Sequence, residues 1–193
     1  MTSQVIMSKP EETQDALPEQ AALSVTIESI EPQRDAASIY ALLTEDPAHI
    51  ATFGFDTIDL SSVEAVERFL DKLGDDNFAA LAGGQMAGNV YLTDSRQIPG
   101  ASLISYWVAK RYARQGIGTE AVRQATSLAF EKLGKKIVIA TVEANNQASR
   151  ALLKNAGYTM FSRANQEVKG KGILEICSYG INNPNRPIPV TDT

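Results

Sequence analysis

The part of the chain that most constrains its fold is the stretch between Trp107 and Tyr158. It reads as a strand, a glycine loop, a helix, a second strand and a short capped helix, with the loop at Ala-Arg-Gln-Gly-Ile-Gly-Thr, residues 113–119. Gly116 and Gly118 allow the loop backbone to come close to a ligand. The helix that begins there offers free N–H groups and the positive end of its dipole. The stretch therefore predicts a phosphate-binding site.

Length and charge limit the class of protein. The chain has 193 residues, which suits one sizeable domain, and a net charge of -5, which argues against general nucleic-acid binding. It has no apolar run of membrane-spanning length, and it lacks the basic flank and apolar stretch of a signal peptide. We therefore expect a cytoplasmic protein, monomeric or homodimeric, with no nucleic-acid partner and no membrane partner.

Cysteine and histidine usage excludes several kinds of site. Cys177 is the single cysteine, so an internal disulfide and a cysteine-based metal cluster are ruled out. His49 is the single histidine, which removes any catalytic triad or metal site that needs two histidines. We expect no metal.

The composition divides the chain into three parts. Residues 1–22 are polar, acidic and proline-containing, and we expect them to be disordered. Residues 182–193 are rich in asparagine and proline and suggest a flexible tail. Residues 23–181 lie between them and read as one domain without repeats.

Hydrophobic periodicity within this domain predicts a mixed α/β (α+β) architecture of about four helices and about seven strands. Ser61 or Ser62 is a suitable cap for the second helix, and Asn145 or Asn146 for the fourth. The predicted helices are 31–44, 59–73, 118–133 and 147–155, and the predicted strands are 23–30, 77–82, 86–92, 102–109, 137–142, 158–168 and 173–181.

Two familiar phosphate loops fit the glycines poorly. A P-loop requires Lys and Ser or Thr after its last glycine, whereas Thr119 and Glu120 follow Gly118 here. The pattern Gly116-x-Gly118-x-x-Ala121 matches a dinucleotide fingerprint. However, residues 110–115 separate it from the preceding strand, and too little chain follows for the rest of a dinucleotide-binding sheet.

A third interpretation is an acyl-CoA pyrophosphate loop. Four segments occur in the order and at the spacings of one family: Ser-Tyr-Trp-Val-Ala at 105–109, Gly-Ile-Gly-Thr-Glu-Ala at 116–121, Asn-x-x-Ser at 146–149, and Leu-Lys-x-x-Gly-Tyr at 153–158. Over residues 23–181 the chain resembles the GNAT superfamily of acetyl-CoA-dependent N-acetyltransferases, and within it the RimJ/RimL-type branch.

The resemblance implies a GNAT-like, mostly antiparallel central sheet whose fourth and fifth strands splay apart to admit acetyl-CoA. It implies that the pantetheine arm pairs with backbone near Trp107, Val108 and Ala109, as an added strand does. Asn146 is expected to contact the pantetheine region. The pyrophosphate is expected on the backbone N–H groups of the loop, at Arg114, Gln115, Gly116, Ile117, Gly118 and Thr119.

One position departs from the family pattern. The family usually has Arg or Gln three residues before the first glycine, where this chain has Ala113. Arg114 follows directly and can supply the missing positive charge. Since backbone amides carry most of such a contact, we expect cofactor binding to survive.

The expected chemistry is direct attack of a neutral amine on the thioester, with no covalent intermediate. Ser149, at the serine of the Asn-x-x-Ser pattern, is the expected acid; the alternative is that it only supports the helix start. The glutamate that relatives carry after the Gly-Tyr pair is missing, and Glu143 is the nearest substitute as base. A solvated strand-end acid is the simpler interpretation of Glu143, and a water chain can serve as base instead.

Two functions from different classes follow. The first is N-acetyl transfer to a protein N-terminal α-amine or a small primary amine. The second is a non-catalytic acyl-CoA-binding module that regulates or scaffolds, which Ala113 and the missing base motif suggest. The segment from Thr44 to Val63 and the last hairpin are expected to select the acceptor.

Overall fold

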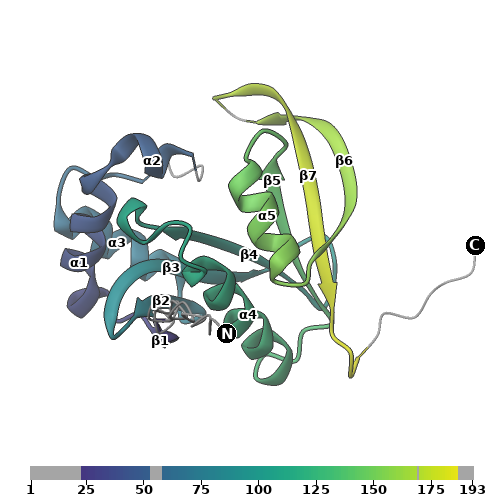
Figure 1. The fold of residues 1–193 in the computed structure, drawn as a ribbon, viewed down its shortest axis with the longest axis horizontal. Helices are drawn as coiled ribbons and strands as arrows, with labels where there is room; N and C mark the ends of the chain where they lie inside the picture. The colour runs from purple at the N-terminus through teal and green to yellow at the C-terminus, as the bar shows by residue number, and fades with distance from the viewer. Residues whose placement is uncertain (1–22, 53–57, 169, 187–193) are drawn as a thin grey trace, which may run out of the picture.

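The computed structural model describes residues 23–52, 58–168 and 170–186, and these form one seven-stranded sheet (Figure 1). The strand order is β1-β2-β3-β4-β5-β7-β6. Neighbouring strands are antiparallel except for the parallel pair β4 and β5. The expected mostly antiparallel sheet is confirmed. The strands are β1 (Val25–Ser29), β2 (Asn77–Ala82), β3 (Gln85–Asp94), β4 (Ala101–Val108), β5 (Ile137–Glu143), β6 (Thr159–Val168) and β7 (Gly172–Asn182).

The described residues form five α-helices, one more than the sequence predicts. The additional helix is α2, which begins at a proline and is too short for a hydrophobic period to reveal it. Within the described ranges, none of the helices has the length and apolar character needed to cross a membrane. The helices are α1 (Pro32–Glu45), α2 (Pro47–Ala51), α3 (Val63–Leu73), α4 (Ile117–Glu131) and α5 (Gln147–Asn155), with a 3-10 turn, η1 (Lys110–Tyr112), before the glycine loop.

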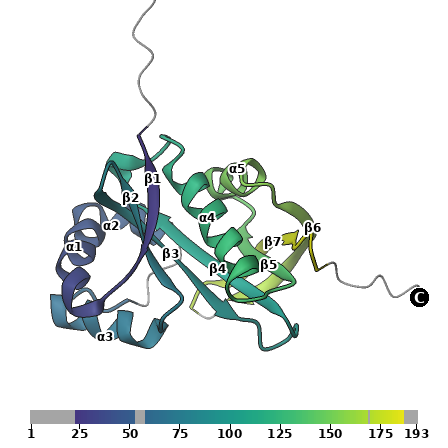
Figure 2. The same cartoon turned by 90° about the horizontal axis from the view of Figure 1, so that it is seen from below.

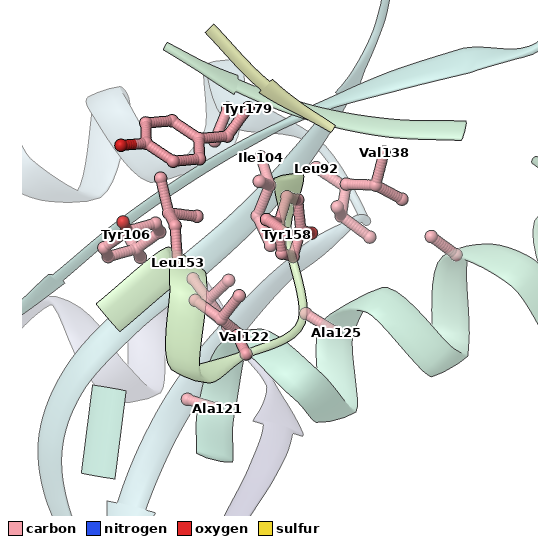
Figure 3. Packing of buried hydrophobic residues seen from close by; sticks show 14 of the residues in the cluster. Leu92, Ile104, Tyr106, Ala121, Val122, Ala125, Val138, Leu153, Tyr158 and Tyr179 are labelled. Carbon is pink, nitrogen blue, oxygen red and sulfur yellow. The ribbon is translucent and has the colours of Figure 1, made fainter. Parts of the chain in front are cut away.

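Helices cover both faces of the sheet and create two hydrophobic cores. α1 and α3 lie on one face and α4 lies across the other (Figure 2). Because successive side chains of a strand point to opposite faces, Tyr106 joins the α4 core whereas Trp107 joins the α1 and α3 core. Figure 3 shows part of the α4 core, in which Val122 of α4 and Leu153 of α5 lie close together.

The parallel pair is short, and this produces the opening in the sheet. β4 and β5 pair only from Ala101 to Leu103 on β4 and from Ile137 to Ile139 on β5. β4 continues to Val108 and β5 to Glu143, and Figure 1 shows the two strands separating. β5 instead keeps β7 as its neighbour along its whole length. The predicted splay between the fourth and fifth strands is therefore present.

The chain remains in contact with the domain beyond residue 182. Asn183 is buried, its N–H donates to the Lys136 carbonyl at 2.8 Å, and its Nδ2 donates to the Lys135 carbonyl at 2.9 Å. Arg186 Nη1 donates to the Gly134 carbonyl at 3.0 Å. Residues 182–186 thus tie the end of β7 to the turn after α4, and the remainder of the expected tail, like the expected disordered segment 1–22, lies outside the described residues.

Candidate active site

A cavity of about 730 Å³ lies where β4 and β5 separate. Its walls come from β3, β4, β5, α3, α5 and the β6–β7 hairpin, so segments far apart in the sequence meet there. The lining includes the hydroxyl-bearing residues Tyr91, Thr93, Ser105, Tyr106, Thr141 and Ser149, together with Glu143, Asn146, Gln166 and Lys171. Both expected catalytic residues therefore face one cavity.

The outer edge of β4 presents backbone groups to the gap left by β5. A Cβ placed on Gly88 of β3 would lie 2.2 Å from the Trp107 carbonyl oxygen, so that carbonyl points toward β3. Carbonyls alternate in direction along a strand, and the Val108 carbonyl therefore points toward the gap. The Ala109 N–H donates to the Ala87 carbonyl at 2.8 Å. Of the three residues expected beside pantetheine, Val108 is the one that offers backbone to the gap, whereas the Trp107 side chain is buried in the core.

The two loop positions require glycine for different structural reasons. Gly116 caps α4 with a left-handed backbone (φ 79°), and a Cβ there would meet no protein atom within 4 Å. Gly118 is buried, and a Cβ there would lie 2.7 Å from Leu152 and 3.1 Å from Val108. Gly116 therefore leaves open space at the start of the helix, while Gly118 lets α4 approach α5 and β4.

The loop fits an anionic group through its backbone. Gly116 has no side chain with which to cap α4, so the N–H groups of Ile117, Gly118 and Thr119 point out of the first turn. Together with the helix dipole they provide the donors that a pyrophosphate requires. The Gln115 side-chain Nε2 donates to the Arg111 carbonyl at 2.9 Å, so this side chain stabilises the loop by a local hydrogen bond.

The basic residues ahead of the loop are partly neutralised. Lys110 Nζ lies 2.6 Å from Asp46, and Arg111 Nη1 lies 2.7 Å from Glu45. Lys110 holds the pKa of the Asp46 carboxyl below its usual range by hydrogen bonding to it. Arg114 is exposed and has a left-handed backbone (φ 63°). Since Lys110 and Arg111 face carboxylates, Arg114 is the cation of this stretch best placed for an anion.

The start of α5 brings Asn146 and Ser149 to the cavity. Asn146 Oδ1 accepts the Ser149 N–H at 3.0 Å, which confirms Asn146 as the cap. Its Nδ2 donates to the Thr52 carbonyl at 3.2 Å. Ser149 is 8% exposed, and its Oγ lies 2.6 Å from the hydroxyl of Tyr106. The helix start is thus satisfied by Asn146, and the Ser149 hydroxyl is directed at β4 instead.

Glu143 ends β5 on the cavity wall. Its carboxylate lies 3.5 Å from Lys171 Nζ, and its side chain is 34% exposed. Residues 139–143 of β5 all line the cavity, and Glu143 lies at the end of the strand. Glu143 is therefore an ion-paired acid that faces the cavity. No sequence pattern indicated Lys171 as its partner, because Lys171 lies in the turn of the last hairpin.

The helix α2 bridges the mouth of the gap. In the middle of α2, His49 Nε2 lies 3.0 Å from the Val108 carbonyl oxygen, and at its C-terminal end the Thr52 carbonyl accepts from Asn146. The two groups that α2 contacts are therefore among those expected to meet pantetheine. Residues 53–57, which follow α2 in the segment expected to select the acceptor, lie outside the described ranges.

A family model describes most of the domain. The model of the acetyltransferase (GNAT) domain matches residues 24–159. A protein of Bacillus subtilis (strain 168), YdaF, whose name places it among the ribosomal N-acetyltransferases, is 26% identical over 142 residues. That match covers 69% of this chain and 77% of the relative.

Solved structures share the fold at low identity. RimJ of Mycobacterium smegmatis, in complex with a CoA disulfide, has a TM-score of 0.74 at 20% identity, over 86% of each chain. The RimL ribosomal L7/L12 α-N-protein acetyltransferase, in complex with coenzyme A, has a TM-score of 0.71 at 15% identity, over 82% of this chain and 93% of its own.

Proposed function

The chain belongs to the GNAT acetyltransferase family, it is an N-acetyltransferase, and we propose that it carries an acetyl group from acetyl-CoA to the α-amine of a protein N-terminus. The observation that carries this proposal is the gap between β4 and β5, closed at one end by a helix that begins with a left-handed glycine. RimJ/RimL-type neighbours and the YdaF relative, whose names refer to ribosomal proteins or CoA, support the acceptor class and the donor.

The residues that fit the donor form a continuous track. The outward N–H groups at residues 117–119 and the exposed Arg114 suit the pyrophosphate, and the open space beside Gly116 leaves room for it. The Val108 carbonyl and the Asn146 amide suit the amides of the pantetheine arm. The track leads from the loop along the outer edge of β4 to Ser149 and Glu143 in the cavity.

The two candidate catalytic residues can divide the proton transfers. Glu143, on the wall formed by β5, accepts a proton from the attacking amine, directly or through water. Ser149, at the start of α5, donates a proton to the departing sulfur. An α-amine has a pKa near 8, so it needs only modest help from an ion-paired carboxylate. This favours an N-terminal amine over a lysine side chain, whose pKa is near 10.4.

A thiol-release assay with acetyl-CoA tests this function. We expect CoA release with peptides that reproduce ribosomal-protein N-termini, and no release when the same peptides are N-terminally blocked. Release only with small primary amines would show that the acceptor is a small molecule and not a protein N-terminus, and the acetyltransferase activity would stand. Calorimetric binding of acetyl-CoA without release for any acceptor would favour the CoA-binding module instead.

A further inference from the structure

The buried hydroxyl of Tyr106 connects the two sides of the gap. Tyr106 lies on β4, is 9% exposed, and lines the cavity. Its hydroxyl is 2.6 Å from Ser149 Oγ and 3.5 Å from the Ser149 carbonyl oxygen. Figure 3 shows its ring beside the helix that carries Leu153, which is α5. The contact joins β4 to α5 at the point where β5 has separated from β4.

The position of Tyr106 on its strand determines this contact. The Trp107 carbonyl points toward Gly88 of β3, so the backbone of Tyr106 faces the gap. The Tyr106 side chain meanwhile packs among Val122, Leu153 and the other residues of the α4 core. One residue thus borders the cofactor track with its backbone and reaches the proposed acid with its side chain.

The direction of the hydrogen bond decides whether Ser149 is useful as an acid. A serine hydroxyl has one proton, and a proton given to Tyr106 is not available to a departing sulfur. Burial raises the pKa of the Tyr106 phenol, so it remains protonated over the physiological range and has a proton to donate. When Tyr106 donates to Ser149 Oγ, the serine O–H is left to point into the cavity.

We propose that Tyr106 is a positioning residue that donates to Ser149 Oγ and thereby aims the Ser149 proton at the sulfur that leaves. This inference rests on the proposed role of Ser149. The amine nitrogen forms a bond to the acetyl carbon, the carbon–sulfur bond breaks, and the sulfur takes the Ser149 proton. Ser149 regains a proton from water, the amine gives its own proton to Glu143 or water, and Tyr106 keeps its proton throughout.

Tyr158 provides a matched control. It is 3% exposed, belongs to the same core as Tyr106, and its hydroxyl lies 2.7 Å from Thr126 Oγ1. Burial raises its pKa as well. Tyr158→Phe therefore removes the same group, from a similar hydroxyl–hydroxyl bond, beside α4 rather than at the cavity. Because phenylalanine fills nearly the same space as tyrosine, both variants are expected to fold.

The test compares Y106F, Y158F, S149A and the Y106F/S149A double variant in the full-length protein. Steady-state turnover is measured with acetyl-CoA and an N-terminal peptide, and the free energy of unfolding is measured for each variant. We expect Y106F to lower kcat about tenfold, the effect of one lost hydrogen bond in the transition state, with KM for acetyl-CoA changed less than about twofold. The double variant is expected to turn over no slower than S149A, because the two residues act as one unit.

The outcomes distinguish the proposed role of Ser149 as the acid from the proposed role of Tyr106 in positioning it. Unchanged turnover in S149A would remove Ser149 from the mechanism, and the role of Tyr106 with it. If S149A is impaired while Y106F turns over as fast as Y158F, the positioning role is overturned and Ser149 stands. Fully additive losses in the double variant would also overturn the positioning role, because additivity shows that Tyr106 and Ser149 act independently of each other.

Discussion

At the scale of single residues, Gly116 needs to be a glycine because of its backbone conformation and not because a neighbouring protein atom excludes a side chain. Its φ of 79° is unfavourable for any other L-residue, yet its surroundings are open. Gly116→Ala should cost about 1–2 kcal/mol of folding free energy through the left-handed backbone. It should also weaken acetyl-CoA binding about tenfold or more, since the new methyl group projects into the space proposed for the pyrophosphate.

Gly74 supplies the comparison for that prediction. It also has a positive φ, 78°, and a Cβ added there would meet no protein atom within 4 Å, but it lies at the end of α3. Gly74→Ala should therefore destabilise the fold at least as much and leave the affinity for acetyl-CoA unchanged. Calorimetry on both variants measures the difference; equal affinities would contradict the pyrophosphate assignment.

Glu143 is the residue whose role depends most on pH. If it accepts the amine proton, Glu143→Gln should lower kcat about tenfold at pH 7, a modest base effect for an α-amine. The loss should shrink as pH rises past about 8, where the amine deprotonates without help. Glu175→Gln is the control, because Glu175 also forms an ion pair, with Arg163 at 2.7 Å, and is not among the residues that line the cavity. A pH-independent loss in Glu143→Gln would indicate a structural ion pair with Lys171.

At the scale of elements, α2 competes for the groups that the cofactor is proposed to use. His49 Nε2 contacts the Val108 carbonyl, and removing this contact should free that carbonyl. We expect His49→Ala to tighten acetyl-CoA binding roughly fivefold, the value of about one hydrogen bond. Thr44→Ala, which removes a hydroxyl bonded within α1, should leave affinity unchanged. Weaker binding in His49→Ala would show instead that α2 supports the edge of β4.

The same elements show which local features were predictable. The Asn146 cap and the bounds of α5 follow from the sequence because a cap, an apolar stripe and a glycine stop all lie within a few residues. Helix α2 was missed because five residues hold no readable period. The contact between Tyr106 and Ser149 was missed because the two residues are 43 positions apart and meet only through the relative placement of β4 and α5.

At the scale of the whole molecule, the sheet and its splay were predictable and the contents of the cavity were not. Strand patterns indicated seven strands, and the resemblance to the GNAT superfamily implied the opening between β4 and β5. Lys171, Tyr91 and Thr93 reach the cavity only because the last hairpin and β3 fold to opposite sides of it. Such residues carry no local signal, since their role depends on the relative placement of distant strands.

The α4 core also predicts how the whole protein responds to alkali. Burial raises the pKa of both Tyr106 and Tyr158 above the value of about 10 expected in the unfolded chain. Between pH 10 and the folded-state values, the native state therefore holds more protons than the unfolded state. The stability that the neutral tyrosines provide is full below pH 10 and is lost as pH rises, by about 1.4 kcal/mol per pH unit for each tyrosine.

Comparison with a Y106F/Y158F double variant isolates this effect, because lysines and exposed tyrosines titrate equally in both proteins. The free energy of unfolding should fall more steeply above pH 10 in the parent than in the double variant, by about 2.7 kcal/mol per pH unit. Chemical denaturation at pH 9, 10 and 11 measures both slopes. Because each tyrosine contributes one titrating proton, each single variant should recover about half of the difference. Parallel slopes in parent and double variant would show that the tyrosines ionise within the folded protein, and that the core around them opens to water before the chain unfolds.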